Sequence, residues 1–206
     1  MPDVVMANTA PGRPPLVPEI TLRLADEPFD LWERTGDDLP FWAFAWAGGQ
    51  AVARHVLDHP ALVQGRAVLD LASGSGLVAI AAAMAGAKTV TATDVDPLAI
   101  EAITRNAQAN NVLVDARLID VLDEPTVDAD IILAGDVCYD RAMTARVLPF
   151  LARMAGHGIE VVIGDPGRPH FPRTGRTALA SYDVPATAAV EAEDTTRATV
   201  WRHDRG

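Results

Sequence analysis

The sequence predicts an α/β fold in which a mostly parallel sheet carries helices on both faces and ends in an antiparallel hairpin. Three observations predict it. From residue 66 onward, short apolar stretches alternate with longer helix-forming stretches, the rhythm of consecutive strand–helix–strand units. The first of these strands runs into a glycine-containing turn. Near the end of the chain the alternation stops, and two strand-like stretches flank a polar segment, which indicates a hairpin.

The part of the chain before residue 66 has a different character. Residues 1–18 carry five prolines, and we expect a flexible arm there. A short strand is expected at 20–25. The aromatic segment 41–46 then leads into an amphipathic helix that ends before Pro60, because the residue ahead of a proline disfavours the helical conformation.

The alternating region gives the remaining elements in order. Polar or glycine-containing stretches separate them, and Pro97 suits the first turn of a helix. We expect strands at 66–72, 89–94, 116–120, 128–136 and 159–166, helices at 77–87, 96–111 and 141–156, and final strands at 179–185 and 198–203.

Composition narrows the classes of function. The formal charge of −11 disfavours binding to nucleic acid phosphates and favours a basic or lysine-bearing partner. A single cysteine, Cys138, excludes an internal disulfide, and the pair His55 and His59 lacks a nearby third ligand, so we expect no metal site. No apolar run reaches the roughly 18 residues of a membrane span, and the first residues do not resemble a signal peptide. We therefore expect a cytoplasmic protein that does not associate with membranes.

The segment VLDLASGSG (68–76) has the features of a nucleoside-binding turn. Gly74 and Gly76 allow a sharp bend and a close approach of the backbone to a ligand. The helix that follows directs unpaired N–H groups toward this bend. Asp94 ends the next strand twenty positions after Gly74, where a carboxylate can bind ribose hydroxyls. The pattern predicts a ligand of the adenosine type.

Two kinds of ligand fit this turn. Gly74 to Ala79 match the dinucleotide fingerprint G-x-G-x-x-A. However, Asp70 would repel a pyrophosphate and attract an ammonium group, and only 40 residues follow residue 166, too few for a separate catalytic domain. S-adenosyl-L-methionine carries a ribose and an amino group but no phosphate, so we favour it over a dinucleotide.

Two further strand ends carry polar side chains. Asp120 follows the third strand of the alternating region, where it would accept from the adenine amine; the alternative is a solvated carboxylate. Asp136 and Tyr139 follow the fourth strand, at the crevice where open α/β sheets place their chemistry. Asp136 would equally suit the N-cap of a helix that starts near Arg141.

At this point the sequence resembles a known family. Asp136 to Tyr139 (DVCY) match the D-x-x-Y motif of the seven-β-strand, or class I, S-adenosylmethionine-dependent protein-lysine methyltransferases. Together with FWAFAWAGGQ, VLDLASGSGLVAIAAA, TATDVDP and IGDPGR, the motif makes the chain similar to bacterial relatives of the electron transfer flavoprotein beta-subunit lysine methyltransferase. Ala72 departs from the family, since many methyltransferases have glycine there; because alanine is small, we expect cofactor binding to survive.

The resemblance implies a Rossmann-like, seven-stranded sheet in a single domain at 19–206, with an N-terminal cap at 19–60, a cofactor-binding core at 66–166 and C-terminal strands at 167–206. It implies S-adenosyl-L-methionine as cofactor, S-adenosyl-L-homocysteine as product, and a lysine-bearing protein substrate, expected to be the electron transfer flavoprotein beta subunit. The open alternatives are a small-molecule N-methyltransferase for nicotinamide-like amines and a cofactor-binding module without turnover.

The resemblance also implies roles for individual residues. Asp136 would orient the lysine amine, because a lone carboxylate favours the charged form and cannot itself make the amine nucleophilic. Tyr139 would line the lysine channel. Trp46 would border the methyl donor through cation–π attraction, whereas Phe41 and Phe44 are expected to pack in the core. For Trp42 the site and the core are equally expected. Asp165 and Arg168 either shape substrate entry or form an ordinary turn. The expected cofactor-binding residues are Trp46, Asp70, Ala72, Gly74, Gly76, Asp94, Val95, Asp120, Val121 and Ala134.

Overall fold

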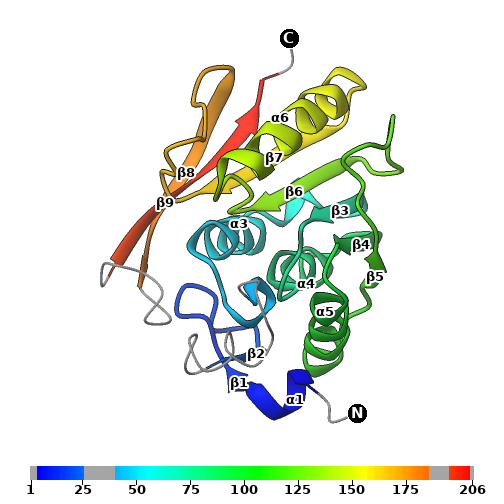
Figure 1. The fold of residues 1–206 in the computed structure, drawn as a ribbon, viewed down its shortest axis with the longest axis vertical. Coiled ribbons are helices and arrows are strands. Elements are labelled where there is room, and N and C mark those ends of the chain that lie inside the picture. Colours follow the sequence, from blue (N-terminus) through cyan, green and yellow to red (C-terminus); the bar gives the residue numbers. More distant parts are fainter. Residues whose placement is uncertain (1–3, 26–39, 186–194, 205–206) are drawn as a thin grey trace.

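The computed structural model describes residues 4–25, 40–185 and 195–204, and its centre is a seven-stranded sheet with the order β5-β4-β3-β6-β7-β9-β8 (Figure 1). Five strands are parallel, and β9 runs antiparallel between β7 and β8. This confirms the predicted mostly parallel sheet with an antiparallel C-terminal hairpin. The strands are β3 (Ala67–Leu71), β4 (Thr89–Asp94), β5 (Asp115–Leu118), β6 (Ile131–Gly135), β7 (Glu160–Asp165), β8 (Arg176–Pro185) and β9 (Thr195–His203).

The strand order reverses between β3 and β6. The chain builds outward from β3 through β4 to β5, and then returns to place β6 on the other side of β3 with Val68 opposite Ile131. In open parallel sheets, ligands bind outside the carboxyl ends of the strands at such a switch point. The sheet topology therefore fixes where a site is expected before any side chain is considered.

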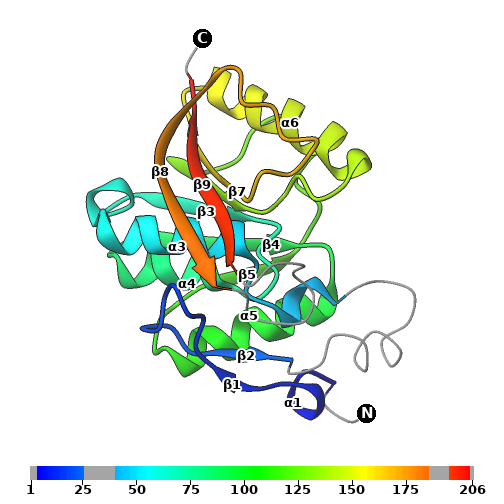
Figure 2. The ribbon, with the colours of Figure 1, turned by 90° about the vertical axis from the view of Figure 1, so that its left-hand side faces the viewer.

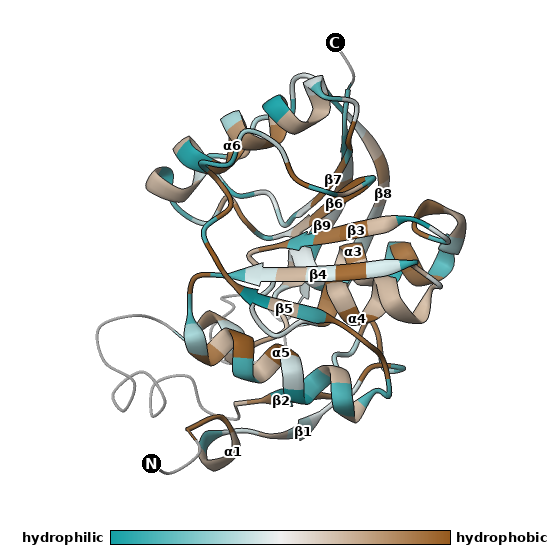
Figure 3. Cartoon of the chain, turned by 90° about the vertical axis from the view of Figure 1, so that its right-hand side faces the viewer, coloured by the Kyte–Doolittle hydropathy of each residue, from teal (hydrophilic) through white to brown (hydrophobic). Residues whose placement is uncertain are grey.

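Helices cover both faces of the sheet (Figures 1 and 2). One face carries α3 (Ala47–Asp58), α4 (Leu77–Met84) and α5 (Pro97–Ala109), and the opposite face carries α6 (Arg141–Gly156). Successive residues of a strand point to opposite faces, so Ile131 joins the core on the α3–α4 side and Ile132 joins the core under α6. Figure 3 shows the contrast between the hydrophobic central strands and the hydrophilic edge strand β5.

The N-terminal residues differ from the expected flexible arm over 1–18. In the described part, from residue 4, the chain forms α1 (Val4–Asn8) and β1 (Ala10–Gly12), which pairs antiparallel with β2 (Leu22–Leu24). The side chains of Val5 and Val17 are fully buried. The prolines allow an extended path over the surface, and the apolar side chains between them anchor that path to the core.

The side-chain amides of Asn106 in α5 and of Asn110, the C-cap of α5, hold the end of this segment in place. Asn110 Oδ1 accepts from Thr21 N at 2.9 Å, and Asn106 Oδ1 accepts from Arg23 N at 2.8 Å. Asn106 is fully buried and its Nδ2 also donates to Ser75 O at 2.8 Å. The N-terminal strand is therefore linked through one amide to the turn that follows β3.

Two short 3₁₀ turns, η1 (Phe41–Ala43) and η2 (Pro60–Leu62), flank α3. None of the helices in the described ranges has the length and apolar content that crossing a bilayer requires. The polar stretch expected between the two hairpin strands includes residues 186–194, which lie outside the described residues.

Candidate active site

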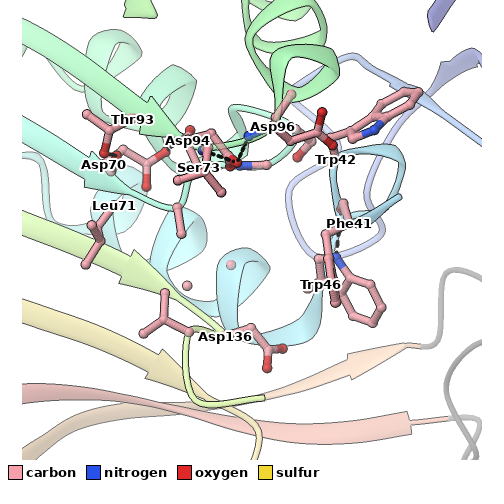
Figure 4. Close-up of a pocket in the computed structure, with 18 of the residues that line it drawn as sticks. Phe41, Trp42, Trp46, Asp70, Leu71, Ser73, Thr93, Asp94, Asp96 and Asp136 are labelled. Carbon is pink, nitrogen blue, oxygen red and sulfur yellow. Dashed lines mark hydrogen bonds between the residues drawn. The ribbon is translucent and has the colours of Figure 1, made fainter. Parts of the chain in front are cut away.

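A cleft of about 690 Å³ opens at the carboxyl ends of the parallel strands (Figure 4). This volume lies in the range of small-molecule and cofactor sites. Its walls are the turn after β3, the ends of β4 and β6, the aromatic segment 40–46 and the loop 119–122. Figure 4 shows Asp94 and Asp136 at opposite ends of the view, with Phe41 and Trp46 along one side.

The turn after β3 has an unusual backbone. Ala72, Gly74 and Gly76 all have positive φ angles, of 51°, 55° and 83°. Alanine adopts this left-handed conformation only at an energetic cost, of the order of 1 kcal/mol or more. Ala72 and Gly74 line the cleft. Gly76 is buried and begins α4; a Cβ there would come within 3.3 Å of Ile103, so this glycine serves helix packing rather than the cleft wall.

Asp70 lies beneath this turn and is almost completely buried. Its Oδ2 accepts from the Ser73 hydroxyl at 2.5 Å and from Ala79 N at 3.0 Å. Burial raises the pKa of this carboxyl to about 7, against the lowering effect of the two hydrogen bonds. Asp70 still lines the cleft, and a cationic group placed beside it would favour the ionised carboxylate.

Asp94 joins the end of β4 to the turn. Its Oδ2 accepts from Gly74 N at 2.9 Å, and its Oδ1 accepts from Val95 N at 2.8 Å and Asp96 N at 3.1 Å (Figure 4). Burial raises the pKa of Asp94, opposed by these hydrogen bonds. A carboxylate offers about four acceptor positions, so one remains for a ligand hydroxyl. Asp94 and the glycine turn thus lie together, and the direct hydrogen bond between them goes beyond the sequence-based expectation, which concerned ribose hydroxyls.

Asp120 lies at the cleft wall on the far side of β4, together with Val121. Its Oδ2 pairs with Arg146 Nη1 at 2.8 Å, and its Oδ1 accepts from Leu122 N at 3.1 Å. Burial acts to raise its pKa, but the hydrogen bonds from Arg146 and Leu122 outweigh it and the pKa is lowered. The sequence analysis missed Arg146, which competes for the carboxylate that was expected to bind adenine.

Val95 and Ala134 have opposite surroundings. Val95 follows Asp94, lines the cleft and is 67% exposed, so a bound ring could cover it. Ala134 is fully buried and belongs to the core under α6. Of the ten expected cofactor-binding residues, Ala134 and Gly76 are the two that do not line the cleft.

Asp136 directly follows β6 and has a left-handed backbone, with φ of 60°. Its side chain is buried, and each oxygen has a partner: Oδ2 accepts from Gly48 N at 3.2 Å, and Oδ1 accepts from Arg168 Nε at 2.8 Å. The alternative of a helix N-cap is wrong for Asp136, because Asp140 caps α6 by accepting from Met143 N at 2.7 Å. Asp136 is therefore not used to cap α6, and it lines the cleft.

Four glycines bring α3 against the strands at this point. A Cβ at Gly48 would come within 2.5 Å of Gly164 O, and one at Gly135 within 2.5 Å of the Cα of Gly49. Gly48 is the second residue of α3, so its N–H and the positive end of the helix dipole face the carboxylate of Asp136. The structure places this glycine pair against β6 and β7.

The aromatic segment forms the mouth of the cleft. The ring of Phe41 lies 5.7 Å from Trp46 and 4.8 Å from Tyr139 between centroids, and Trp46 Nε1 donates to Phe41 O at 2.9 Å. Phe41 and Tyr139 are more than a third exposed, whereas Phe44 and Trp42 are buried. Core packing is thus confirmed for Phe44 but wrong for Phe41, which forms part of the mouth with Trp46 and Tyr139.

Comparison with known proteins gives relatives over almost the whole chain. The chain is 37% identical over 209 residues to the electron transfer flavoprotein beta subunit lysine methyltransferase of Xenopus laevis, covering 96% of this chain and 84% of that protein. It is 39% identical to the mouse protein of the same name, covering 90% and 77%. Residues 55–137 also match the family model described as ribosomal protein L11 methyltransferase (PrmA).

Solved structures with low sequence identity share the fold. A ribosomal protein L11 methylase from Lactobacillus delbrueckii subsp. bulgaricus superposes with a TM-score of 0.55 at 19% identity, covering 78% of this chain and 81% of that one. A tRNA (uracil-54, C5)-methyltransferase from Pyrococcus abyssi, solved in complex with S-adenosyl-L-homocysteine, gives a TM-score of 0.51 at 18% identity, covering 73% and 38%. At these identities the likeness concerns the arrangement of strands and helices.

Proposed function

We propose that this chain, which belongs to the electron transfer flavoprotein beta subunit lysine methyltransferase family, methylates lysine side chains of the electron transfer flavoprotein beta subunit. The observation that carries the proposal is Asp136, a buried carboxylate that faces a cleft whose mouth is aromatic. A lysine side chain combines an apolar stem with a cationic tip, and this mouth matches both.

The cofactor of the reaction is S-adenosyl-L-methionine, and the polar groups of the cleft fit it. Asp94 supplies an acceptor for ribose hydroxyls beside the glycine turn. Asp70 supplies a carboxylate for an amino group, and the two arginines among the described residues that line the cleft, Arg146 and Arg168, pair with Asp120 and Asp136 rather than with the turn. We assign Trp46, Ala72, Gly74, Val95, Asp120 and Val121 to the remaining walls.

When bound, the methyl donor supplies a sulfonium-activated methyl group that an amine attacks in line. The protein's part is to align the amine and to keep water out. Phe41, Trp46 and Tyr139 would enclose the lysine stem, and Asp136 would accept a hydrogen bond from the amine so that its lone pair points into the cleft. Asp136 is held for this by Gly48 and Arg168.

Surface charge supports a protein substrate. The chain carries a formal charge of −11, which favours approach of a lysine-bearing partner and disfavours nucleic acid. The mouth residues Phe41 and Tyr139 are open to solvent rather than covered by the described chain, as a site for a macromolecule requires. We further propose a cytoplasmic location.

The test is intact mass spectrometry of the purified flavoprotein beta subunit after incubation with enzyme and methyl donor. We expect mass increases in steps of one methyl group, and we expect Asp136→Asn to abolish them. Asp183→Asn is the matched control, because Asp183 lies exposed on β8 and pairs only loosely with Arg197 at 3.8 Å. A second test incubates the enzyme with labelled methyl donor and cell extract. If the label entered only low-molecular-weight material, the small-molecule alternative would replace this proposal.

A further inference from the structure

Arg168 is paired with Asp136 at the inner end of the cleft. Its Nε donates to Asp136 Oδ1 at 2.8 Å; the carboxylate is 4% exposed and the guanidinium side chain 33%. Arg168 also lines the cleft. Asp136 therefore does not meet an incoming amine as a lone negative charge, because a fixed positive charge already shares it.

The position of Arg168 is set by a turn, not by chance rotation of a surface side chain. Asp165, the last residue of β7, accepts through Oδ1 from Gly167 N at 2.7 Å and from Arg168 N at 2.9 Å. Gly167 has a φ of 88°, which turns the chain back toward the cleft. Asp165 is buried, and its Oδ2 has no hydrogen-bond partner among the described residues.

The other charged and titratable groups around this pair come from three elements. Asp165 approaches the pair from β7, Cys138 and Tyr139 belong to the segment of Asp136 itself, and Arg176 of β8 lies near Cys138 and Asp204. The first turn of α3 brings no acidic side chain, only the N–H of Gly48 and the positive end of its dipole. Arg168 thus pairs directly with Asp136, and together with the N-terminal end of α3 it balances the charge of this carboxylate.

This charge balance bears on how lysine becomes a nucleophile. Free lysine has a pKa of about 10.4, and a lone carboxylate beside it would hold the ammonium form still more firmly. The ammonium has no lone pair and cannot attack a methyl carbon. A site that is close to neutral can accept a hydrogen bond from the amine without favouring its charged form.

We propose that Arg168 is a positioning residue whose guanidinium neutralises Asp136, so that the carboxylate orients the substrate amine in its neutral, nucleophilic form. The inference rests on the proposed lysine methylation. In the reaction, the lysine ammonium first releases a proton to water. The nitrogen lone pair then forms the N–C bond while the C–S bond breaks and its electron pair stays on sulfur, leaving a methylated ammonium and a neutral thioether.

The pH dependence of kcat with the flavoprotein beta subunit as substrate tests this role, because the acid limb of kcat reports groups that titrate in the enzyme–substrate complex. In Arg168→Gln, Asp136 becomes a bare carboxylate, and we expect the acid limb to move to higher pH by about one unit or more, from Coulomb's law at an effective dielectric constant of about 20. Activity lost at neutral pH should return as the pH is raised. Arg168→Lys keeps the charge and should hold the limb near its wild-type position.

A binding measurement separates this role from that of a structural or anchoring residue. Calorimetry at neutral pH, with the unmethylated subunit and S-adenosyl-L-homocysteine, should show Arg168→Gln binding at least as tightly as wild type. Arg173→Gln removes an exposed arginine from the same connection between β7 and β8 and should match wild type in both assays. Thermal unfolding of each variant shows that the fold is intact.

Three outcomes oppose the proposal. An acid limb that stays in place while activity falls equally at every pH would make Arg168 a structural residue. Weaker binding in Arg168→Gln would make it a substrate anchor. If Arg168→Gln bound the subunit more tightly but the acid limb of kcat did not move, Arg168 would only compete with the substrate lysine for Asp136 and would not affect the protonation of the amine. Failure of the proposed function has a different signature, since the wild-type enzyme itself would leave the subunit unmodified at every pH.

Discussion

Gly48→Ala tests whether close backbone packing holds the catalytic end of the sheet together. The added Cβ would lie 2.5 Å from Gly164 O and 2.8 Å from Asp136 N, both backbone atoms that cannot rotate away. The start of α3 must therefore move, which also weakens the bond from Gly48 N to Asp136. Overpacking of this kind costs about 1–3 kcal/mol, and loss of a hydrogen bond to a charged group adds about 1.5–3 kcal/mol if the bond breaks.

The neighbouring Gly49→Ala is a matched control. A Cβ there meets only the Val78 side chain, at 4.0 Å, and its backbone has no positive φ. Alanine is favoured over glycine in a helix by up to about 1 kcal/mol, so this variant should be as stable as wild type or slightly more stable. Urea unfolding gives the free energies, and methylation of the substrate protein reports the displaced carboxylate. Equal stability and activity of the two variants would refute the packing argument.

Two further predictions concern the cofactor end of the cleft. Asp94→Ala should weaken binding of S-adenosyl-L-homocysteine at least tenfold by calorimetry, which corresponds to about 1.4 kcal/mol for lost charged hydrogen bonds. The control Asp128→Ala changes an exposed residue and should leave this binding unchanged. NAD should not bind to the wild-type protein. For Asp70 the pKa in the folded protein is about 7 against 3.8 for an unperturbed aspartate, so the folded protein holds the extra proton and its stability falls as the pH rises between these values. The free energy of unfolding of Asp70→Asn, relative to wild type, should therefore rise from pH 4 to about 7 and then level off. If urea unfolding gave the same difference between the two proteins across that range, the raised pKa of Asp70 would be wrong.

The sequence predicted best where local residues decide the structure. The strand at 89–94 and the helix at 141–156 have the expected bounds. The placement of Asp94 beside the glycine turn was also expected, because a strand–turn–helix unit and the next strand bring positions twenty apart to one edge of a sheet. The direct bond from Gly74 N to Asp94 was not expected.

The interpretation failed where distant residues decide. Proline content at 1–18 indicated an extended or mobile arm, but Val5 and Val17 within it are buried. Asn106 of α5 and its C-cap Asn110, 83 and 89 positions away, bond to the backbone that follows. The bond between Gly48 and Asp136 spans 88 positions, and that between Arg168 and Asp136 spans 32. A glycine pair signals a close approach in general, yet only the strand order shows which backbone approaches it. For the same reason the sequence did not show that Phe41 lies beside Tyr139 at the mouth of the cleft rather than in the core.

The backbone of Asp136 explains why this position suits an aspartate. Its N–H donates to Gly164 O at 2.8 Å, which fixes the chain as it leaves β6, and the resulting φ of 60° lies in the left-handed region. Aspartate and asparagine tolerate that region better than other residues with side chains. Glycine would relieve the strain but would carry no acceptor, and asparagine would keep the shape but lose the charge that holds Arg168. Aspartate alone combines a tolerated left-handed backbone, a negative charge and a side chain short enough to reach the N–H of Gly48 from this bend.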